Sequence, residues 1–172
     1  MSTSHTPSVT GVGEALTWTL AESGLGQHVE IRGEINENAD FTELKKVLHG
    51  EVVLDLEGVT RINSCGVREW VNFVRGLEGV HGLRFLRCSP MVVLQLNTIY
   101  NFRGPARVIS FLAPYVCEVC QVDEYRELTV EEHFPDRLIA HVPSFRCERC
   151  GGVLVFDELP ERYLSFLAEE SR

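Results

Sequence analysis

Three features that would assign a chain to a common class are missing from this sequence. No apolar run in its 172 residues approaches the roughly 20 residues that a membrane-spanning helix needs. The N-terminus has neither the basic start nor the apolar core of a secretory signal, so we expect no export and a cytoplasmic location. Basic residues are also few, because 16 lysines and arginines stand against 25 aspartates and glutamates, which gives a net charge of −9.

The shortage of basic residues bears on the partners that the chain can bind. Nucleic-acid affinity depends mainly on Lys and Arg neutralising phosphates, and anionic membranes attract the same side chains. The stretch 111–157 holds nine acidic residues and only four basic ones. We therefore expect no nucleic-acid partner and no membrane partner.

Cysteines, in contrast, are arranged in a distinctive way. Two Cys-x-x-Cys pairs are separated by 26 residues, and two glycines follow the second pair directly; the four cysteines are Cys117, Cys120, Cys147 and Cys150. Two intervening residues let one turn of backbone aim both sulfurs at one ion, and Zn²⁺ prefers four such thiolates in a tetrahedron. Apolar alternating runs leave each pair, so the sequence predicts a two-hairpin zinc ribbon with a structural Zn²⁺.

Other interpretations of these cysteines are two disulfides or four unrelated thiols. A redox site usually has a single Cys-x-x-Cys beside a βαβ pattern, which fits this spacing poorly. His133 and His141 lie between the pairs and could replace one thiolate, although four cysteines already complete a shell. Cys65 and Cys88 have no partner at metal spacing, and we interpret both as structural.

Periodicity divides the chain into four parts. Residues 1–13 are rich in Ser, Thr and Gly and predict a disordered tail. Residues 14–112 alternate between period-two and helical patterns in the order strand-strand-helix-strand-helix-strand-helix-strand, which predicts an α/β fold whose mixed sheet is covered by helices. The ribbon is expected over 113–156, and a C-terminal helix over 157–172 is expected to pack on the main domain.

A loop before the second predicted helix is the other distinctive stretch. The apolar strand 52–56 contains Asp-Leu, a loop follows, and a helix then starts at Asn63-Ser64-Cys65-Gly66; upstream lies the turn Gly33-Glu34-Ile35-Asn36. In these two segments and in the order of its elements, the stretch 14–112 resembles the STAS family of bacterial anti-sigma-factor antagonists and related regulatory domains. The ribbon is not part of the usual pattern of that family.

The resemblance implies a regulatory domain that is not an enzyme. Such domains bind a protein partner, often a serine-kinase-like anti-sigma factor, and phosphorylation of the motif serine switches the binding off. Matched residue by residue, Ser64 is the phosphoacceptor candidate, and the partner-binding loop comprises Asn36, Asn63, Ser64, Cys65 and Gly66. Both motif aspartates of the family are asparagines here, Asn36 and Asn63, which puts recognition of this loop by a kinase in doubt.

Physical chemistry leaves two roles open for Ser64. Its hydroxyl would act as an N-cap, accepting a backbone N–H at the start of the helix. Alternatively, a phosphate there would add roughly −1.5 to −2 charge at a helix N-terminus, where the dipole and the free N–H groups favour an anion. A partner docked over the loop would then meet both charge and bulk.

Two other functions compete with a regulatory module. A zinc ribbon often marks a nucleic-acid adaptor, but the acidic composition argues against that function here. An enzyme would use 113–156 as a lid, but Asp55, Glu57 and Ser64 have no histidine beside them in the loop that could complete a catalytic set. A zinc ion with four thiolates also has no open position for a water molecule.

Overall fold

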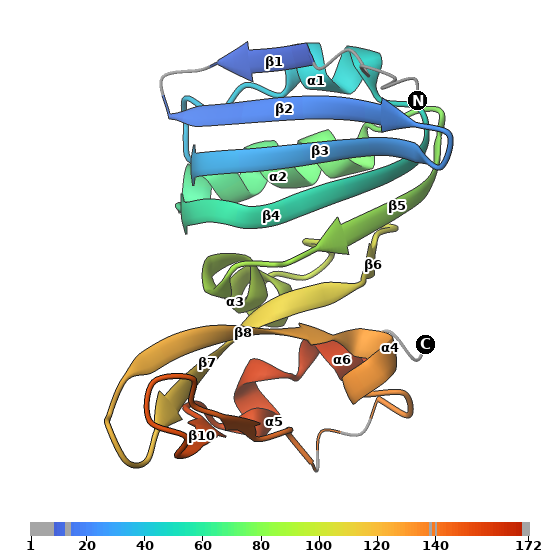
Figure 1. Cartoon of the computed structure of the whole chain (residues 1–172). Coiled ribbons are helices and arrows are strands. Elements are labelled where there is room, and N and C mark those ends of the chain that lie inside the picture. The colour runs from blue at the N-terminus through green and yellow to red at the C-terminus, as the bar shows by residue number, and fades with distance from the viewer. Residues whose placement is uncertain (1–8, 13–14, 138, 140, 170–172) are drawn as a thin grey trace, which may run out of the picture.

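The computed structural model describes residues 9–12, 15–137, 139 and 141–169, which form two lobes (Figure 1). The N-terminal lobe contains a six-stranded sheet and three helices, and the C-terminal lobe contains a four-stranded sheet and three short helices. The mixed α/β class predicted from the sequence is therefore confirmed. No helix in the described part of the chain combines the length and apolar character needed to cross a membrane.

The N-terminal sheet has the strand order β1-β2-β3-β4-β5-β6. Pairing is antiparallel between β1, β2 and β3 and parallel from β3 to β6. The six strands are β1 (Val9–Val12), β2 (Leu16–Ser23), β3 (Gly26–Ile35), β4 (Gly50–Ile62), β5 (Val80–Leu86) and β6 (Arg107–Val108). Alternate residues of β2 and β3 are buried, as the period-two pattern of the sequence predicts for strands with one covered face.

Helices cover one face of this sheet. Figure 1 shows α1 and α2 behind β2, β3 and β4, and the opposite face of these strands has no helix over it in the described part of the chain. The three helices are α1 (Thr42–Val47), α2 (Ser64–Arg75) and α3 (Pro90–Thr98). Trp70 of α2 is fully buried, and its indole N–H donates to the carbonyl of Phe102 at 3.1 Å. The buried indole thus ties α2 to the loop after α3.

The C-terminal lobe has an antiparallel sheet in the order β8-β7-β10-β9. Its strands are β7 (Ser110–Cys117), β8 (Asp123–Thr129), β9 (Phe145–Arg146) and β10 (Val153–Phe156), and α4 (Val130–His133) follows β8. A parallel bridge between Cys88 and Phe111 joins the start of β7 to the end of β5. One continuous core of buried residues extends through both lobes.

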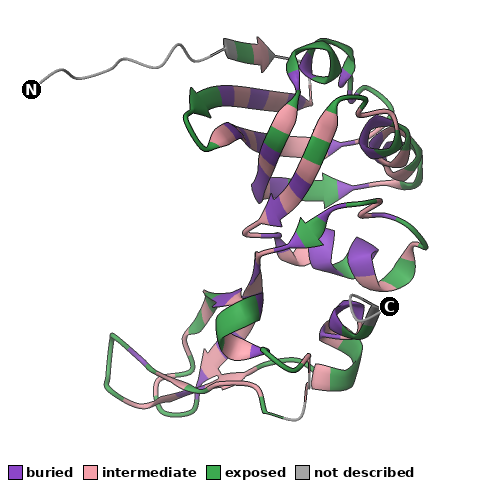
Figure 2. Ribbon diagram, turned by 90° about the vertical axis from the view of Figure 1, so that its right-hand side faces the viewer, coloured by how far each residue is buried: buried purple, intermediate pink, exposed green. Residues whose placement is uncertain are grey.

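The C-terminal segment lies against α3, as Figure 2 shows directly below that helix. One helix was expected over 157–172, but the described residues form two short ones, α5 (Pro160–Tyr163) and α6 (Phe166–Glu169). The side chain of Asn97 donates to the Tyr163 carbonyl at 2.8 Å, and the N–H of Leu167 donates to Leu164 at 3.0 Å. The Tyr163 carbonyl thus accepts from α3 and not from the N–H of Leu167. The α-helical hydrogen-bond pattern therefore ends at this residue.

The N-terminal tail expected over 1–13 lies partly outside the described residues. Within it, Val9–Val12 form β1, which pairs with β2 from Val9–Leu20 to Val12–Thr17. Gly11 lies directly against the indole of Trp18, where a larger side chain would collide with the ring. Because Gly11 has no side chain, β1 can pair with β2 at the edge of the sheet. Composition alone does not reveal this contact with Trp18.

Candidate functional site

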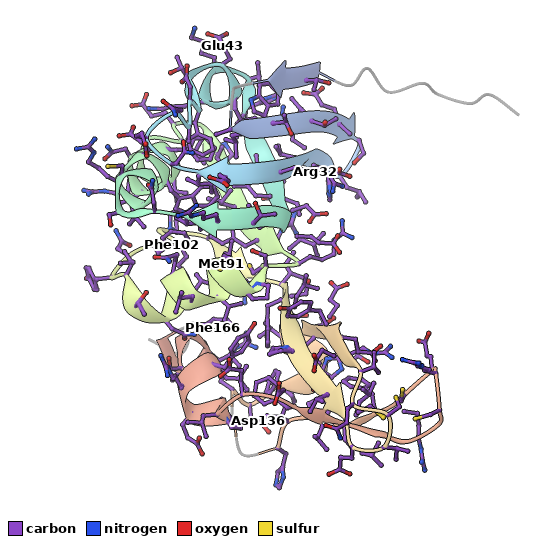
Figure 3. All side chains as sticks on the ribbon, turned by 90° about the vertical axis from the view of Figure 1, so that its left-hand side faces the viewer. Arg32, Glu43, Met91, Phe102, Asp136 and Phe166 are labelled. Carbon is purple, nitrogen blue, oxygen red and sulfur yellow. The ribbon has the colours of Figure 1, made fainter. Side chains whose placement is uncertain are left out.

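The four cysteines come together at the tip of the C-terminal lobe. Figure 3 shows their sulfur atoms, in yellow, at the end of this lobe farthest from α3. Cys117 ends β7, and Leu154 of the neighbouring strand β10 pairs with it. Because β9 and β10 form a hairpin, the turn that carries Cys147 and Cys150 lies beside the turn after β7. The sheet thus joins two segments that are far apart in the chain.

The two turns repeat the same backbone pattern. In the first, the N–H of Cys117 donates to Val122 at 3.0 Å, and the N–H of Gln121 donates back to Cys117 at 3.0 Å. In the second, the N–H of Cys147 donates to the Gly152 carbonyl at 2.8 Å, and the N–H of Gly151 donates back to the Cys147 carbonyl at 2.8 Å. The fifth residue of each turn has a positive φ, 55° at Gln121 and 73° at Gly151. The glycine predicted to close the second turn does so, and Gln121 adopts the same conformation in the first.

The spacing of the sulfurs fits a shared metal ion. Cys117 and Cys150 are 3.5 Å apart at their sulfurs, Cys120 and Cys147 are 3.7 Å apart, and all four sulfurs lie within 4.8 Å of one another. A disulfide would require about 2.05 Å. Four sulfurs placed tetrahedrally at about 2.3 Å from one ion would lie about 3.8 Å from each other. The cluster could therefore hold a metal ion without rearrangement.

The electrostatics of the cluster favour a bound cation. The backbone N–H of Cys120 is the main cause that lowers the pKa of the Cys117 thiol to about 6. For Cys120 the backbone N–H of Val122 acts to lower the pKa, but burial and the other three thiols raise it to about 12. The thiolate of Cys117 therefore opposes ionisation of Cys120 beside it. A bound cation would offset this repulsion, because cysteines bind a metal ion as thiolates.

Neither histidine that could have replaced a thiolate is a member of the cluster. His133 Nδ1 instead lies 3.1 Å from the backbone nitrogen of Thr129 and 3.0 Å from its carbonyl. His141 is exposed in the loop before β9.

The second candidate site is the start of α2. Asn63, and not Ser64, caps this helix, because its Oδ1 accepts the backbone N–H of Gly66 at 2.8 Å. Ser64 is the first helical residue and is exposed. The expectation that the Ser64 hydroxyl forms the cap is therefore wrong by one residue. Asn63 has the extended backbone (φ −102°, ψ 175°) that an N-cap requires, whereas Ser64 is already helical.

The loop after β3 meets the start of α2. The backbone N–H of Asn63 donates to Ile35 at 3.2 Å, and its side-chain amide donates to the carboxylate of Glu37 at 2.7 Å. This hydrogen bond is the main cause that lowers the pKa of Glu37. Gly66 packs on the Ile35 carbonyl so closely that any side chain there would collide with it. Asn36 Oδ1 accepts the N–H of Asn38 at 2.9 Å and so stabilises the turn.

One cavity adjoins the start of α2, and a second cavity shares a single lining residue with it. The first, of about 220 Å³, is lined by Ile62, Asn63, Ser64, Val67, Gln95 and Ile99. Ile99 also lines the second cavity of about 540 Å³, to which Tyr100, Phe102 and Phe166 contribute. Figure 3 shows Phe102 and Phe166 near the junction of the lobes. Tyr100 is 98% exposed, so its ring stands in solvent at the edge of the second cavity.

Cys65 and Cys88 differ in their environments. Cys88 is buried at the bridge between the lobes, as expected for a structural cysteine. Cys65 is exposed and belongs with Ser64 to the surface of the first turn of α2.

A polar cluster on the open face of the N-terminal sheet was not anticipated. Asp55 of β4 is buried, pairs with Arg87, and lies 3.7 Å from Nε2 of His28. His28, Glu30 and Asp55 are close enough to share an ion, although the Arg87 guanidinium already neutralises Asp55. Ser64 lies at the start of α2, and among the described residues no hydrogen bond joins it to His28 or Asp55. Only the register of β3 on β4 brings His28, Glu30 and Asp55 together.

Comparisons with protein-family models, with curated proteins and with solved structures find no match for this chain. Support for a function must come from the geometry of its own residues.

Proposed function

We propose that this chain is a non-catalytic regulatory module that binds a protein partner through the surface around Ser64, and that Zn²⁺ holds its C-terminal lobe together. The observation that carries the proposal is the junction of Asn63 with the 35–37 loop. It places an exposed serine at the first position of a twelve-residue helix, beside a loop that two hydrogen bonds hold in place. Rigid presentation of a polar loop is typical of a recognition surface.

The STAS-like assignment is supported by the arrangement of the elements. The two segments that carry the resemblance, 33–36 and 63–66, lie side by side because β3 and β4 are parallel neighbours. Asn36 accepts a backbone N–H in the loop, and Asn63 accepts one at the helix start. Both use an amide oxygen in place of a carboxylate. A partner that recognises this surface would meet amide groups where family members present acids.

A phosphate on Ser64 would change this surface without unfolding the helix. The hydroxyl is exposed, and the capping hydrogen bond belongs to Asn63, so modification would leave the cap in place. The phosphate would add to the negative charge of Glu37, whose carboxylate accepts from the amide of the adjacent residue Asn63 at 2.7 Å. Repulsion between these charges and the bulk of the phosphate would oppose a docked partner.

The exposed ring of Tyr100 supports a protein as the ligand of this surface. Aromatic side chains supply much of the contact energy in protein interfaces. Tyr100 and Ser64 contribute to adjoining cavities that share Ile99, so one partner could contact both.

The proposal of a structural Zn²⁺ rests on the four-sulfur geometry. The separations of 3.5 and 3.7 Å are close to the tetrahedral value of about 3.8 Å expected around Zn²⁺. With four thiolates the ion would have no exchangeable position, which fits a structural role. The ion would also crosslink the two turns through their four sulfurs, and this would stabilise their arrangement.

The test is affinity capture of the partner combined with intact-mass measurement of the chain. Wild type is compared with Ser64→Ala, Ser64→Asp and Tyr100→Ser, and Ser144→Asp serves as the control because it adds the same charge to an exposed loop of the C-terminal lobe. We expect Ser64→Asp and Tyr100→Ser to lose the captured protein, and Ser64→Ala and Ser144→Asp to keep it. Capture that survives all four substitutions would exclude this surface. An intact mass without phosphate, together with capture by Ser64→Asp, would exclude the switch alone.

A further inference from the structure

Three arginines converge on a cavity at the junction of the two lobes. The cavity has a volume of about 240 Å³ and is lined by Arg84, Arg107, Val108, Ile109, Thr129, Glu131 and Arg137. Arg84 belongs to β5, Arg107 to β6, and Arg137 to the loop after α4. Figure 1 shows β6 between β5 and the C-terminal lobe. We call this cavity the arginine pocket.

Two of these arginines face each other in the sheet. Arg84 and Arg107 are direct partners in the parallel pairing of β5 with β6, so their side chains emerge on the same face. Like charges directly opposite each other destabilise a pair of strands. The pairing therefore places two guanidinium groups side by side at the edge of the sheet, where a bound anion would offset their repulsion.

Carboxylates compensate the charge of Arg84 and Arg107 only in part, and Nη1 of Arg137 donates to the carbonyls of Val130 and Phe134 at 3.5 and 3.3 Å. Glu51 pairs with the outer nitrogen of Arg84 at 3.1 Å, and Glu131 is the one carboxylate among the residues that line the pocket. No carboxylate among the described residues pairs with the Arg107 guanidinium. The Nε of Arg84 is buried without a hydrogen-bond partner in the described part of the chain. A buried donor without an acceptor lowers stability unless a ligand satisfies it.

We propose that the arginine pocket binds the phosphoryl group of a small phosphate ester. Guanidinium groups donate two parallel hydrogen bonds to phosphate oxygens, and several of them around one site favour a dianion over a monoanion. The volume is below the roughly 300 to 1,000 Å³ of pockets that enclose a whole organic ligand. The pocket therefore holds the phosphoryl group, and the rest of the ester lies outside it. The site is separate from the Ser64 surface and does not depend on a protein partner.

The test is calorimetric titration of the full-length chain at pH 8 and low ionic strength. The probes are inorganic phosphate, glycerol 3-phosphate, glycerol and acetate. We expect both phosphates to bind and glycerol and acetate not to bind. Tighter binding of glycerol 3-phosphate than of phosphate identifies an ester as the ligand, whereas equal binding, or binding of neither phosphate, overturns that assignment.

Variants separate a specific pocket from general charge. Arg107→Gln removes the guanidinium without a carboxylate partner, and we expect it to weaken phosphate binding about tenfold. Arg107→Lys keeps the charge but not the paired hydrogen bonds, and should recover part of the affinity. Arg32→Gln is the matched control, because Arg32 lies on the same sheet face and pairs with Glu30 at 3.0 Å (Figure 3). Equal weakening by Arg32→Gln would overturn the proposal.

One further variant should improve binding. Glu131→Gln removes the carboxylate that opposes an anion in the pocket, and we expect affinity for phosphate to rise about threefold. Misfolding cannot produce a gain of affinity, so this variant stays informative even where an arginine variant is unstable. Unchanged or weaker binding by Glu131→Gln would contradict the proposed position of the phosphoryl group.

Discussion

Asn97 Oδ1 accepts the hydroxyl hydrogen of Ser165 at a distance of 2.7 Å, and this contact ties α3 of the N-terminal lobe to the end of the chain. The same oxygen accepts the N–H of Phe166 at 2.8 Å, and the Asn97 amide donates to Tyr163 at 2.8 Å. One side chain thus satisfies polar groups at the break between α5 and α6. Beside it, Phe166 meets Phe111 edge-on at 5.3 Å, so the polar contacts hold an aromatic contact in place.

Loss of this contact should loosen the C-terminal segment. Asn97→Ala removes three hydrogen bonds, and we expect the free energy of unfolding to fall by about 1–2 kcal/mol. Amide hydrogen exchange should accelerate mainly over 160–169, because these residues lose their anchor on α3. Asn72→Ala, at an exposed position of α2, is the control and should change neither measurement. Faster exchange throughout the N-terminal lobe would contradict a local role for Asn97.

The metal proposal predicts separate behaviour of the two lobes. Cys147→Ser should abolish stoichiometric zinc, measured by plasma mass spectrometry, and unfold the two cysteine turns, while the N-terminal lobe stays largely folded. Cys65→Ser, which changes an exposed cysteine outside the cluster, should keep one zinc ion per chain. Wild-type protein that is metal-free after purification and retains ordered turns by NMR would show that no ion is needed.

The cap of α2 can be assigned by stability measurements. Asn63→Ala removes the acceptor for the N–H of Gly66, and we expect a loss of about 1 kcal/mol in the free energy of unfolding. Ser64→Ala should cost less than about 0.5 kcal/mol, because the exposed hydroxyl does not cap the helix. Urea denaturation of both variants provides the comparison. A larger loss of unfolding free energy for Ser64→Ala than for Asn63→Ala would show that Ser64 is the N-cap.

Alkaline pH should destabilise the protein through a buried tyrosine. Burial raises the pKa of Tyr115 to about 12, above the value of about 10 expected in the unfolded chain. The folded state then binds more protons between these values, so this stabilisation is complete below about pH 10 and is lost as the pH rises towards 12. We expect Tyr115→Phe to lessen the decline in unfolding free energy over this range.

The same variant should show a cost at neutral pH. The Tyr115 hydroxyl donates to Pro143 at 2.7 Å, and its removal should lower the free energy of unfolding by about 1 kcal/mol at pH 8. Tyr125→Phe is the control, because Tyr125 is 60% exposed and should leave the alkaline decline unchanged. Parallel declines for wild type and Tyr115→Phe above pH 10 would contradict the assignment.

Features that depend on near neighbours in the chain were predictable from the sequence. The Cys-x-x-Cys spacing aims two sulfurs from one turn, and Gly151 supplies the positive φ that closes it. Alternation of apolar residues along β2 and β3, and the helical spacing around Trp70, indicated the α/β class. These patterns act over one turn or one strand, where sequence separation and distance in space are closely linked.

Other features depended on which elements are neighbours in space. A capping role was one of two left open for Ser64, but Asn63 is the cap, and its backbone N–H donates to Ile35. The Asn97 amide bonds the Tyr163 carbonyl, and the helix that periodicity predicted over 157–172 is therefore broken there. The position of Asn63 and the break between α5 and α6 each depend on a hydrogen bond between two elements. Local sequence patterns do not predict such bonds.

The amino-acid sequence by itself determined the composition, the strand and helix periodicities and the two cysteine turns of this protein. Tertiary structure decided that the two turns face each other across β7 and β10, and that Arg84, Arg107 and Arg137 share one pocket. The physical reason is strand register. Slipping a strand by one residue moves every side chain to the opposite face, and that choice is set by burial over the whole core.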